Sequence, residues 1–146
     1  YTASFEVPYE PGELKACNVK GKKETASASL NTAGNPASIR LTADRSKIKA
    51  DKNDLAYVKI EVLDKDGRVI PDCEIPLEIK SGGKGSVIAS GNGSADDMRS
   101  FRSLTPKTFR GKAIVIVQPD TQEGNIHLTV SAKGLPEANI SIETYE

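Results

Sequence analysis

Few residues in this chain have the chemistry of a catalyst, and His127 comes first because it is the only histidine among 146 residues. Histidine titrates near neutral pH without help from its surroundings, which makes it a frequent general base. Here it alternates with the apolar Ile126 and Leu128, a spacing that places it on the opposite, solvent-facing side of a strand. No nucleophile elbow or neighbouring cysteine accompanies it. We therefore expect a surface histidine and no catalytic residue.

Metal ligands are equally scarce. Cys17 and Cys73 are far apart and lie outside any CxxC motif, so we expect two separate thiols. Zinc takes three or four nitrogen or sulfur ligands, and the chain has a single histidine to add to them. Asp51, Asn53 and Asp54 resemble the start of a calcium loop, but no glutamate follows at the EF-hand spacing, and both residue types are typical of turns. The sequence predicts no metal ion and no cofactor.

Charge and hydropathy argue against two classes of partner. Lys plus Arg number 20 and Asp plus Glu number 20, so the chain lacks the basic excess of a nucleic-acid binder. The one basic cluster, Lys20, Lys22 and Lys23, neutralises too few phosphates to change this. No apolar run approaches the roughly 18 residues of a membrane span. The chain begins at Tyr1 without a signal peptide, and we expect that it was either processed or cut from a longer protein.

The stretch from Gly91 to Arg102 is the best candidate for a contact surface. It is long, polar and rich in glycine, and loops on rigid scaffolds are where proteins make contacts. Phe101 and Phe109 are expected instead to fill the core of a sandwich or its mouth. The chain has no tryptophan and lacks the flat row of aromatics typical of a sugar-binding module. The candidate interface residues are Gly91, Asn92, Gly93, Asp96, Asp97, Arg99 and Arg102.

The elements that must position these residues are strands, because apolar side chains recur with a period of two. In residues 58–62 (Val-Lys-Ile-Glu-Val), the apolar side chains share one face and the charged side chains share the other. The run from Ala113 to Val117 is apolar on both faces, which predicts a central strand that is covered on both sides. The alternation recurs at Ile39 and Leu41, Leu77 and Ile79, Ile126, Leu128 and Val130, and Ile140 and Ile142.

Glycine-rich turns separate these strands at short intervals. Residues 64–67 (Asp-Lys-Asp-Gly) form a hairpin-type turn signal, in which Asp64 and Asp66 are turn residues, and further breaks fall at residues 82–85 and 134–136. Several short strands with such turns predict an all-β fold, an immunoglobulin-like antiparallel β-sandwich. Without tryptophan, the core of this sandwich must consist of Ile, Val and Leu.

A small polar joint at residues 31–37 predicts a domain boundary. We expect residues 1–34 to be the C-terminal strands of a truncated β-sandwich and residues 35–146 to be the immunoglobulin-like domain. A unit as small as the first is marginally stable by itself, and its open strand edges predict self-association. Its expected strands are Phe5–Val7, Glu13–Val19 and Glu24–Leu30.

Residues 7–16 and 30–34 carry a resemblance to a known family. They read V-P-Y-E-P-G-E-L-K-A and L-N-T-A-G. They resemble the C-terminal region of bacterial glycoside hydrolase family 2 enzymes, which are β-galactosidase-like proteins. In that family a Y-x-P-G-x-L-x-A strand and a T-A-G-x-P joint end one β-sandwich and lead into another. Residues 39–45, 64–67 and 114–118 continue the match into the next immunoglobulin-like domain.

The resemblance implies a non-catalytic accessory domain. Its expected roles are to support the catalytic barrel, to make interdomain or subunit contacts, and to hold residues 91–102 at the rim of the substrate cleft. The family's two catalytic glutamates lie on a (β/α)₈ barrel outside this chain, so the implied partner is the remainder of a glycosidase that is periplasmic, secreted or on the cell surface. After Gly93, family members often continue with Asp or Asn and then Pro, whereas this chain has Ser94–Asp97.

The sequence leaves two other functions open. Tandem immunoglobulin-like repeats of bacterial adhesins share similar strand and turn patterns, which would make the chain a spacer in a surface stalk. In an adhesin, however, the first 34 residues should resemble residues 36–146, and they do not. The second alternative is a carbohydrate-binding module, which saturable binding of a galactoside would reveal.

Overall fold

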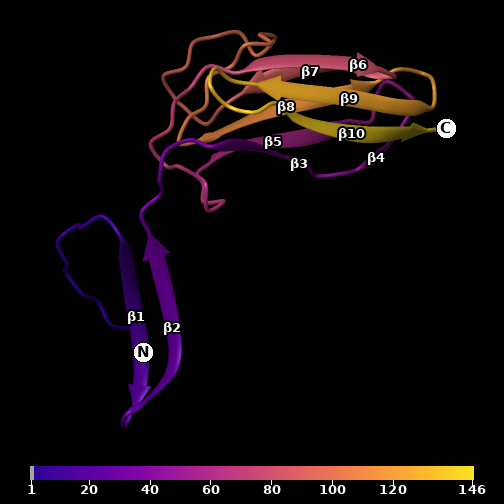
Figure 1. The fold of residues 1–146 in the computed structure, drawn as a ribbon. Coiled ribbons are helices and arrows are strands. Elements are labelled where there is room, and N and C mark those ends of the chain that lie inside the picture. The colour runs from indigo at the N-terminus through magenta and orange to yellow at the C-terminus, as the bar shows by residue number, and fades with distance from the viewer. Residues whose placement is uncertain (1) are drawn as a thin grey trace. The chain divides into compact units, whose positions relative to one another are not determined.

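The computed structural model describes residues 2–146, in which all regular elements are β-strands (Figure 1). These strands form one two-stranded sheet, β1-β2, and two four-stranded sheets ordered β4-β10-β9-β6 and β3-β5-β8-β7. The chain divides after Ala33 into two compact units. The strands are β1 (Glu13–Lys20), β2 (Lys23–Asn31), β3 (Ser38–Ala43), β4 (Lys47–Lys49), β5 (Ala56–Leu63), β6 (Glu78–Gly83), β7 (Gly85–Gly91), β8 (Lys112–Pro119), β9 (Gly124–Ser131) and β10 (Ala138–Tyr145).

The second unit, Gly34–Glu146, is the immunoglobulin-like β-sandwich that the sequence predicts. Its neighbouring strands are antiparallel except for β4, which pairs in parallel with β10. The core lies between the two four-stranded sheets and is made of the alternating apolar side chains, with no aromatic residue among them. Its members are Ile39, Ile48, Ala56, Val58, Ile60, Leu77, Ile79, Ala113, Val115, Val117, Ile126, Leu128, Val130 and Ile142.

Strand β8 corrects one prediction. It is central in its sheet, between β5 and β7, and Val115 and Val117 are fully buried. On its other face, however, Ile114 is 40% exposed and Ile116 is half-buried. The expectation that residues 113–117 are covered on both sides is therefore wrong within this chain. A two-layered sandwich covers only the inner face of each sheet, whatever the composition of the outer face.

The chain passes from one sheet to the other through the predicted break at Lys84, between β6 and β7. Gly83 has φ of +91°, and a Cβ atom there would lie 2.1 Å from the carbonyl oxygen of Asn125. A Cβ atom on Gly85 would lie 2.4 Å from the carbonyl oxygen of Gln118. Glycine is required at this crossing because the two backbones approach more closely than a side chain allows.

The turn after β5 has a second role that the turn signal alone does not reveal. The Asp64 carboxylate is buried and accepts hydrogen bonds from the backbone N–H groups of Gly34 (2.9 Å), Asp66 (2.9 Å) and Arg68 (2.8 Å). These bonds, that of Gly34 first, lower the pKa of Asp64. Asp64 therefore ties the first residue of the sandwich to the hairpin that follows β5.

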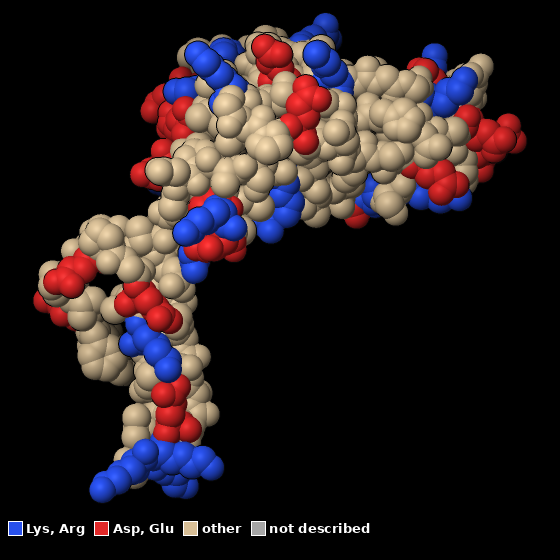
Figure 2. All heavy atoms as spheres, viewed as in Figure 1, with Lys and Arg blue, Asp and Glu red and all other residues tan. Residues whose placement is uncertain are grey.

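The first unit contains the β1–β2 hairpin, whose strands turn at Gly21 with φ of +67°. Every residue of both strands is exposed, including the cross-strand pair Leu14 and Leu30. The predicted strand at Phe5–Val7 is not formed, because residues 2–10 pair with no neighbouring strand. Figure 2 shows positive charge gathered at the hairpin tip, where Lys20, Lys22 and Lys23 lie.

Candidate functional site

The connection from β7 to β8, residues 92–111, contains most of the predicted contact residues and is held against the edge of the other sheet. Strand β6 is an edge strand, and the carbonyl of Leu104 accepts the Ile79 N–H at 2.9 Å. Two residues further on, the Pro106 carbonyl accepts the Leu77 N–H at 2.8 Å. The connection therefore covers part of an otherwise open sheet edge, and this pairing holds its backbone in place.

Thr108 fastens the far end of this connection. Its side chain is buried, and its Oγ1 accepts the Ile75 N–H at 2.9 Å and donates to the Cys73 carbonyl at 3.0 Å. Next to it, Arg110 and Gly111 form a two-residue turn into β8 with φ of +51° and +71°. Positive φ at both positions is what type I′ hairpin turns require. The connection therefore enters β8 through a defined turn.

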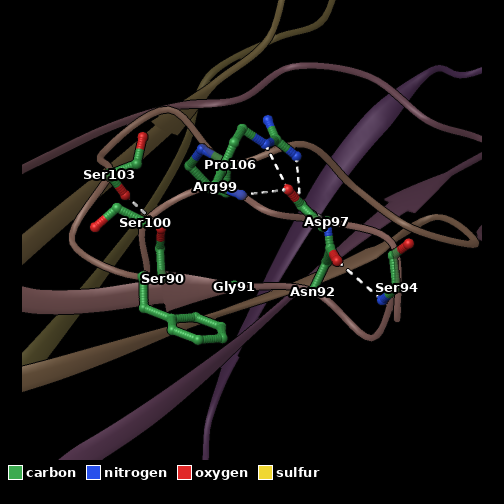
Figure 3. A pocket seen from close by; sticks show the side chains of 10 residues that line it. Ser90, Gly91, Asn92, Ser94, Asp97, Arg99, Ser100, Ser103 and Pro106 are labelled. Carbon is green, nitrogen blue, oxygen red and sulfur yellow. Dashed lines mark hydrogen bonds and ion pairs between the residues drawn. The ribbon is translucent and has the colours of Figure 1, made fainter.

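Asn92, Asp97 and Arg99 form the polar centre of the connection (Figure 3). The Asn92 side-chain amide donates to the Asp97 carboxylate at 2.8 Å and to the Lys107 carbonyl at 2.7 Å, while its Oδ1 accepts the Ser94 N–H at 2.9 Å. One half-buried amide thus joins three parts of the loop. The cost of leaving such a group without partners when buried favours this one loop conformation.

The Asp97–Arg99 pair adds charge to this network. The Arg99 guanidinium contacts both carboxylate oxygens, through Nε at 2.9 Å and through Nη2 at 2.5 Å. The Arg99 backbone N–H also donates to Asp97 at 3.1 Å. These contacts hold the pKa of Asp97 well below its usual range and raise the pKa of Arg99. The contacts therefore favour the ionised form of both side chains.

The hollow behind these residues is small. Its volume is about 50 Å³, and its lining includes Ser90, Asn92, Arg99 and Phe101. Such a space holds a few water molecules at most and not a sugar ring. On the exposed side of the loop, Asn92, Asp97 and Arg99 also line a more open depression of about 290 Å³, whose other wall includes Glu74 and Lys107. A contact with a carbohydrate has room there.

The predicted contact residues do not all meet. Asn92, Asp97 and Arg99 bond to one another, and the exposed Asp96 lines the same depression as these three. Arg102 is exposed and lies apart from them, and neither Asp96 nor Arg102 has a side-chain hydrogen bond or ion pair to the described residues. Gly91 is the last residue of β7 rather than part of the loop, and Gly93 is exposed. The role of this set in contacts stays a prediction.

Phe101 corrects a further expectation. It is 70% exposed and does not fill the core, because its ring lies over Gly91 on the outside of the molecule. Phe109 is half-buried at the mouth of a shallow groove beside Ile114. The exposed Met98 (93%) and Leu104 (45%) accompany Phe101 on the connection. This apolar rim was not predicted, although three large apolar residues within seven positions of a polar loop are a signal for it.

The remaining candidates have structural roles. His127 is exposed on β9, with Ile126 and Leu128 buried beside it, which confirms the surface position. Asp51 accepts the backbone N–H groups of Asn53 and Asp54, both at 2.9 Å, so this acidic segment is a turn. Cys17 is exposed and Cys73 is buried, and the two thiols are separate.

Within residues 2–146, no three His, Cys, Asp or Glu side chains lie close enough to hold a metal ion. No helix in the same residues has the length and hydropathy that crossing a bilayer requires.

This fold and its fastened polar loop define an immunoglobulin-like β-sandwich domain, a class with many functions. Comparison with known proteins shows which family of this class the chain belongs to. Residues 39–141 match the model of the family described as glycoside hydrolase family 2 C-terminal domain 5, and the chain belongs to this family. The match does not favour the adhesin spacer or the carbohydrate-binding module.

The relatives of this chain are much longer than it is. The chain is 36% identical over 143 residues to the β-galactosidase BoGH2A of Bacteroides ovatus, a match that covers 98% of this chain and 17% of that protein. A solved glycosyl hydrolase family 2 member from Bacteroides cellulosilyticus is similar with a TM-score of 0.89 at 34% identity, over 96% of this chain and 18% of that chain. A β-glycosidase from Bacteroides vulgatus gives a TM-score of 0.82 at 30% identity, over 94% and 18%. The chain therefore spans less than a fifth of these relatives.

Proposed function

We propose that this chain is a non-catalytic accessory region of a β-galactosidase-like glycoside hydrolase and acts as a rigid support for its catalytic domain. The observation that carries the proposal is the match of nearly the whole chain to less than a fifth of a β-galactosidase. Retaining glycosidases need two carboxylates about 5 Å apart over the bond they cleave. The best-placed carboxylate of the candidate site, Asp97, is already paired with Arg99.

Activity measurements test whether this chain is non-catalytic while the longer protein is a glycosidase. The 146-residue chain is expected to leave an aryl β-galactoside intact, while the longest open reading frame that contains it hydrolyses the same compound. Hydrolysis by the 146-residue chain alone would overturn the non-catalytic role. The resemblance also supports a periplasmic, secreted or cell-surface location in the parent bacterium, which fractionation of that bacterium tests.

We further propose that the β7–β8 connection contributes to the rim of the substrate cleft. What supports this is its construction: Asn92 and Thr108 hold its backbone, while Arg99 and Arg102 remain accessible for hydrogen bonds to sugar hydroxyls. Removal of residues 94–99 from the parent enzyme should change KM or substrate selectivity. A matched control replaces Asp66 and Arg68, a similar exposed ion pair in the turn after β5. Equal kinetic constants for the loop deletion and the control would contradict the rim role.

For residues 1–34 we propose that they are the last strands of a second β-sandwich. The side chains of Leu14, Ala16, Ala28 and Leu30 form two cross-strand pairs on one face of the hairpin, and all four are exposed. An apolar face of this kind needs a cover. In the 146-residue chain, the open edges of β1 and β2 are expected to recruit a second copy. Light scattering that finds only monomer at high concentration would count against this self-association.

A further inference from the structure

The outer face of the β3-β5-β8-β7 sheet carries an apolar patch at its centre. Residues paired directly across two antiparallel strands point to the same side of the sheet. Ile116 on β8 pairs with Tyr57 on β5 and with Ala89 on β7. Ile114 pairs with Gly91 on β7 and, on its other side, with Lys59 of β5, which borders the patch. Tyr57 is 41% exposed and Ile114 is 40% exposed. These side chains therefore form a continuous surface across three strands.

Phe101 extends this patch from the loop onto the sheet. A Cβ atom on Gly91 would lie 3.2 Å from the Phe101 ring. Since Gly91 pairs directly with Ile114, that Cβ atom would point to the same outer side as Ile114. The ring consequently lies beside Ile114, and the loop and the sheet contribute to one surface. Ile88 is the extra residue at the register shift of β7, directly before the Ala89 that pairs with Ile116, and it is 37% exposed. We call Tyr57, Ile88, Phe101, Ile114 and Ile116 the outer patch.

The outer patch has residue types that are usual in the core of a protein. Three β-branched residues and two aromatic rings lie together, and Tyr57, Ile88, Phe101 and Ile114 are each between 37% and 70% exposed. Single exposed apolar residues are ordinary, but a contiguous group marks an interaction surface. Aromatic residues, here Tyr57 and Phe101 on either side of the two isoleucines of β8, are also enriched among the side chains that carry most of the binding energy in protein interfaces.

The rim of the outer patch is positively charged. Arg110 and Lys112 line the groove next to Ile114, and Arg102 directly follows Phe101 in the chain. None of these three cations forms an ion pair with a described residue. The carboxylates beside the patch already have partners. Glu61, which pairs with Lys112 across the strands, contacts Arg40 at 2.8 Å and Lys59 at 3.1 Å. Asp44, next to Tyr57, accepts the Tyr57 N–H at 2.8 Å and lies 3.9 Å from Arg45. The rim is therefore complementary to a partner surface that carries carboxylates.

We propose that the outer patch packs against another domain of the same longer polypeptide, on an apolar surface edged by carboxylates. This inference rests on the proposed function, since more than four-fifths of the length of the related β-galactosidase lies outside the region that this chain matches. A domain held in one polypeptide can be docked by a patch of modest size, because the tether supplies a high effective concentration. The outer patch then explains why the sequence of β8 reads as a strand covered on both sides.

Cysteine labelling tests the proposal. The variant Ile114→Cys is made in the 146-residue chain and in the longest open reading frame that contains it, and a maleimide reagent is applied to both. The rate at residue 114 is read by mass spectrometry of its peptide, so that other cysteines do not interfere. The matched control is Ser141→Cys, on the outer face of the other sheet, where Ser141 is exposed.

We expect labelling at residue 114 to be at least tenfold slower in the long chain, and labelling at residue 141 to be unchanged. Equal rates at residue 114 in both proteins, or equal protection at both positions, would overturn the proposal. Protection that grows with the concentration of the 146-residue chain would identify a second copy as the occupant and would also overturn it. Hydrolysis of a β-galactoside by the long chain, measured in parallel, reports on the proposed function independently of this result.

Discussion

The strands of the β1–β2 hairpin and of the sandwich both alternate apolar with polar residues, but only the sandwich has a buried core. In the hairpin, every residue of both strands is exposed, and Leu14 and Leu30 face solvent. In the sandwich, Ile60 on β5 is fully buried between two sheets. Alternation makes a strand two-faced, and a second layer is needed before one face becomes a core. The same contrast should appear in the stability of the two regions.

The largest expected effect comes from truncating the sandwich core. Ile60→Ala should reduce the free energy of unfolding by about 2–5 kcal/mol, because it removes buried contacts and leaves a cavity. The matched change in the hairpin, Leu14→Ala, should cost less than about 0.5 kcal/mol, as exposed substitutions usually do. Urea denaturation of the two variants gives both values. Similar losses would mean that the hairpin face is covered in solution.

A smaller effect is expected at the buried carboxylate that begins the sandwich. Asp64→Asn weakens the hydrogen bonds from Gly34, Asp66 and Arg68 and should lower stability at neutral pH. Because the folded pKa of Asp64 lies below its unfolded value of about 3.9, its ionised form stabilises the fold above that pH. This contribution is lost as the pH falls through 3.9 toward the folded pKa.

Thermal unfolding at several pH values measures this contribution. The wild-type protein should lose stability below about pH 4, and Asp64→Asn should lose less over the same interval. Asp66→Asn is the control, since the Asp66 side chain is exposed and bonds only to Arg68 among the described residues. Parallel pH profiles for wild type and Asp64→Asn would show that Asp64 does not anchor the joint.

A local effect is expected in the β7–β8 connection. Asp97→Asn removes the charge that Arg99 contacts, so the backbone amides of residues 94–103 should exchange with deuterium faster. The midpoint of global unfolding should change little, because the Arg99 side chain is 42% exposed and exposed ion pairs contribute weakly to stability. Unchanged exchange in this segment would indicate that Asn92 and Thr108 suffice to hold the loop.

The smallest effect is expected when residues 1–33 are removed. The hairpin contributes no side chain to the core of the sandwich, so the melting temperature of residues 34–146 should equal that of the whole chain. Calorimetry of the two proteins provides the comparison. A lower melting temperature in the shortened protein would show that the two units stabilise each other.

Much of the fold could be predicted from the sequence because its signals are local. Val58, Ile60 and Val62 alternate with charged residues, and Gly83 and Gly85 mark a crossing where no side chain fits. The failures have a shared cause. The sequence around Ile114 reads as buried on both faces, but burial depends on what lies opposite a strand, and the outer face of β8 has no cover among the described residues.

The candidate site could be predicted only in part, because its contacts also depend on residues that are far apart in the sequence. Residues 91–102 are recognisable as a long polar loop, yet the bond between Asn92 and the Lys107 carbonyl joins positions that no local pattern relates. Phe101 looks like a core residue by its type, and its position over Gly91 follows from the path of the loop around β7.

By itself, the sequence determined the all-β class, most of the strands and turns, and the family of glycoside hydrolases, since these depend on residue type and short-range spacing. It did not indicate β4 or β7, and it placed a strand at Phe5–Val7 that does not form. Only the tertiary structure decided which face of each strand is covered, which loop residues meet and where apolar surface is left open. Burial and long-range pairing depend on the separation of residues in space, and side chains that are far apart along the chain acquire these relations only when the two sheets pack together.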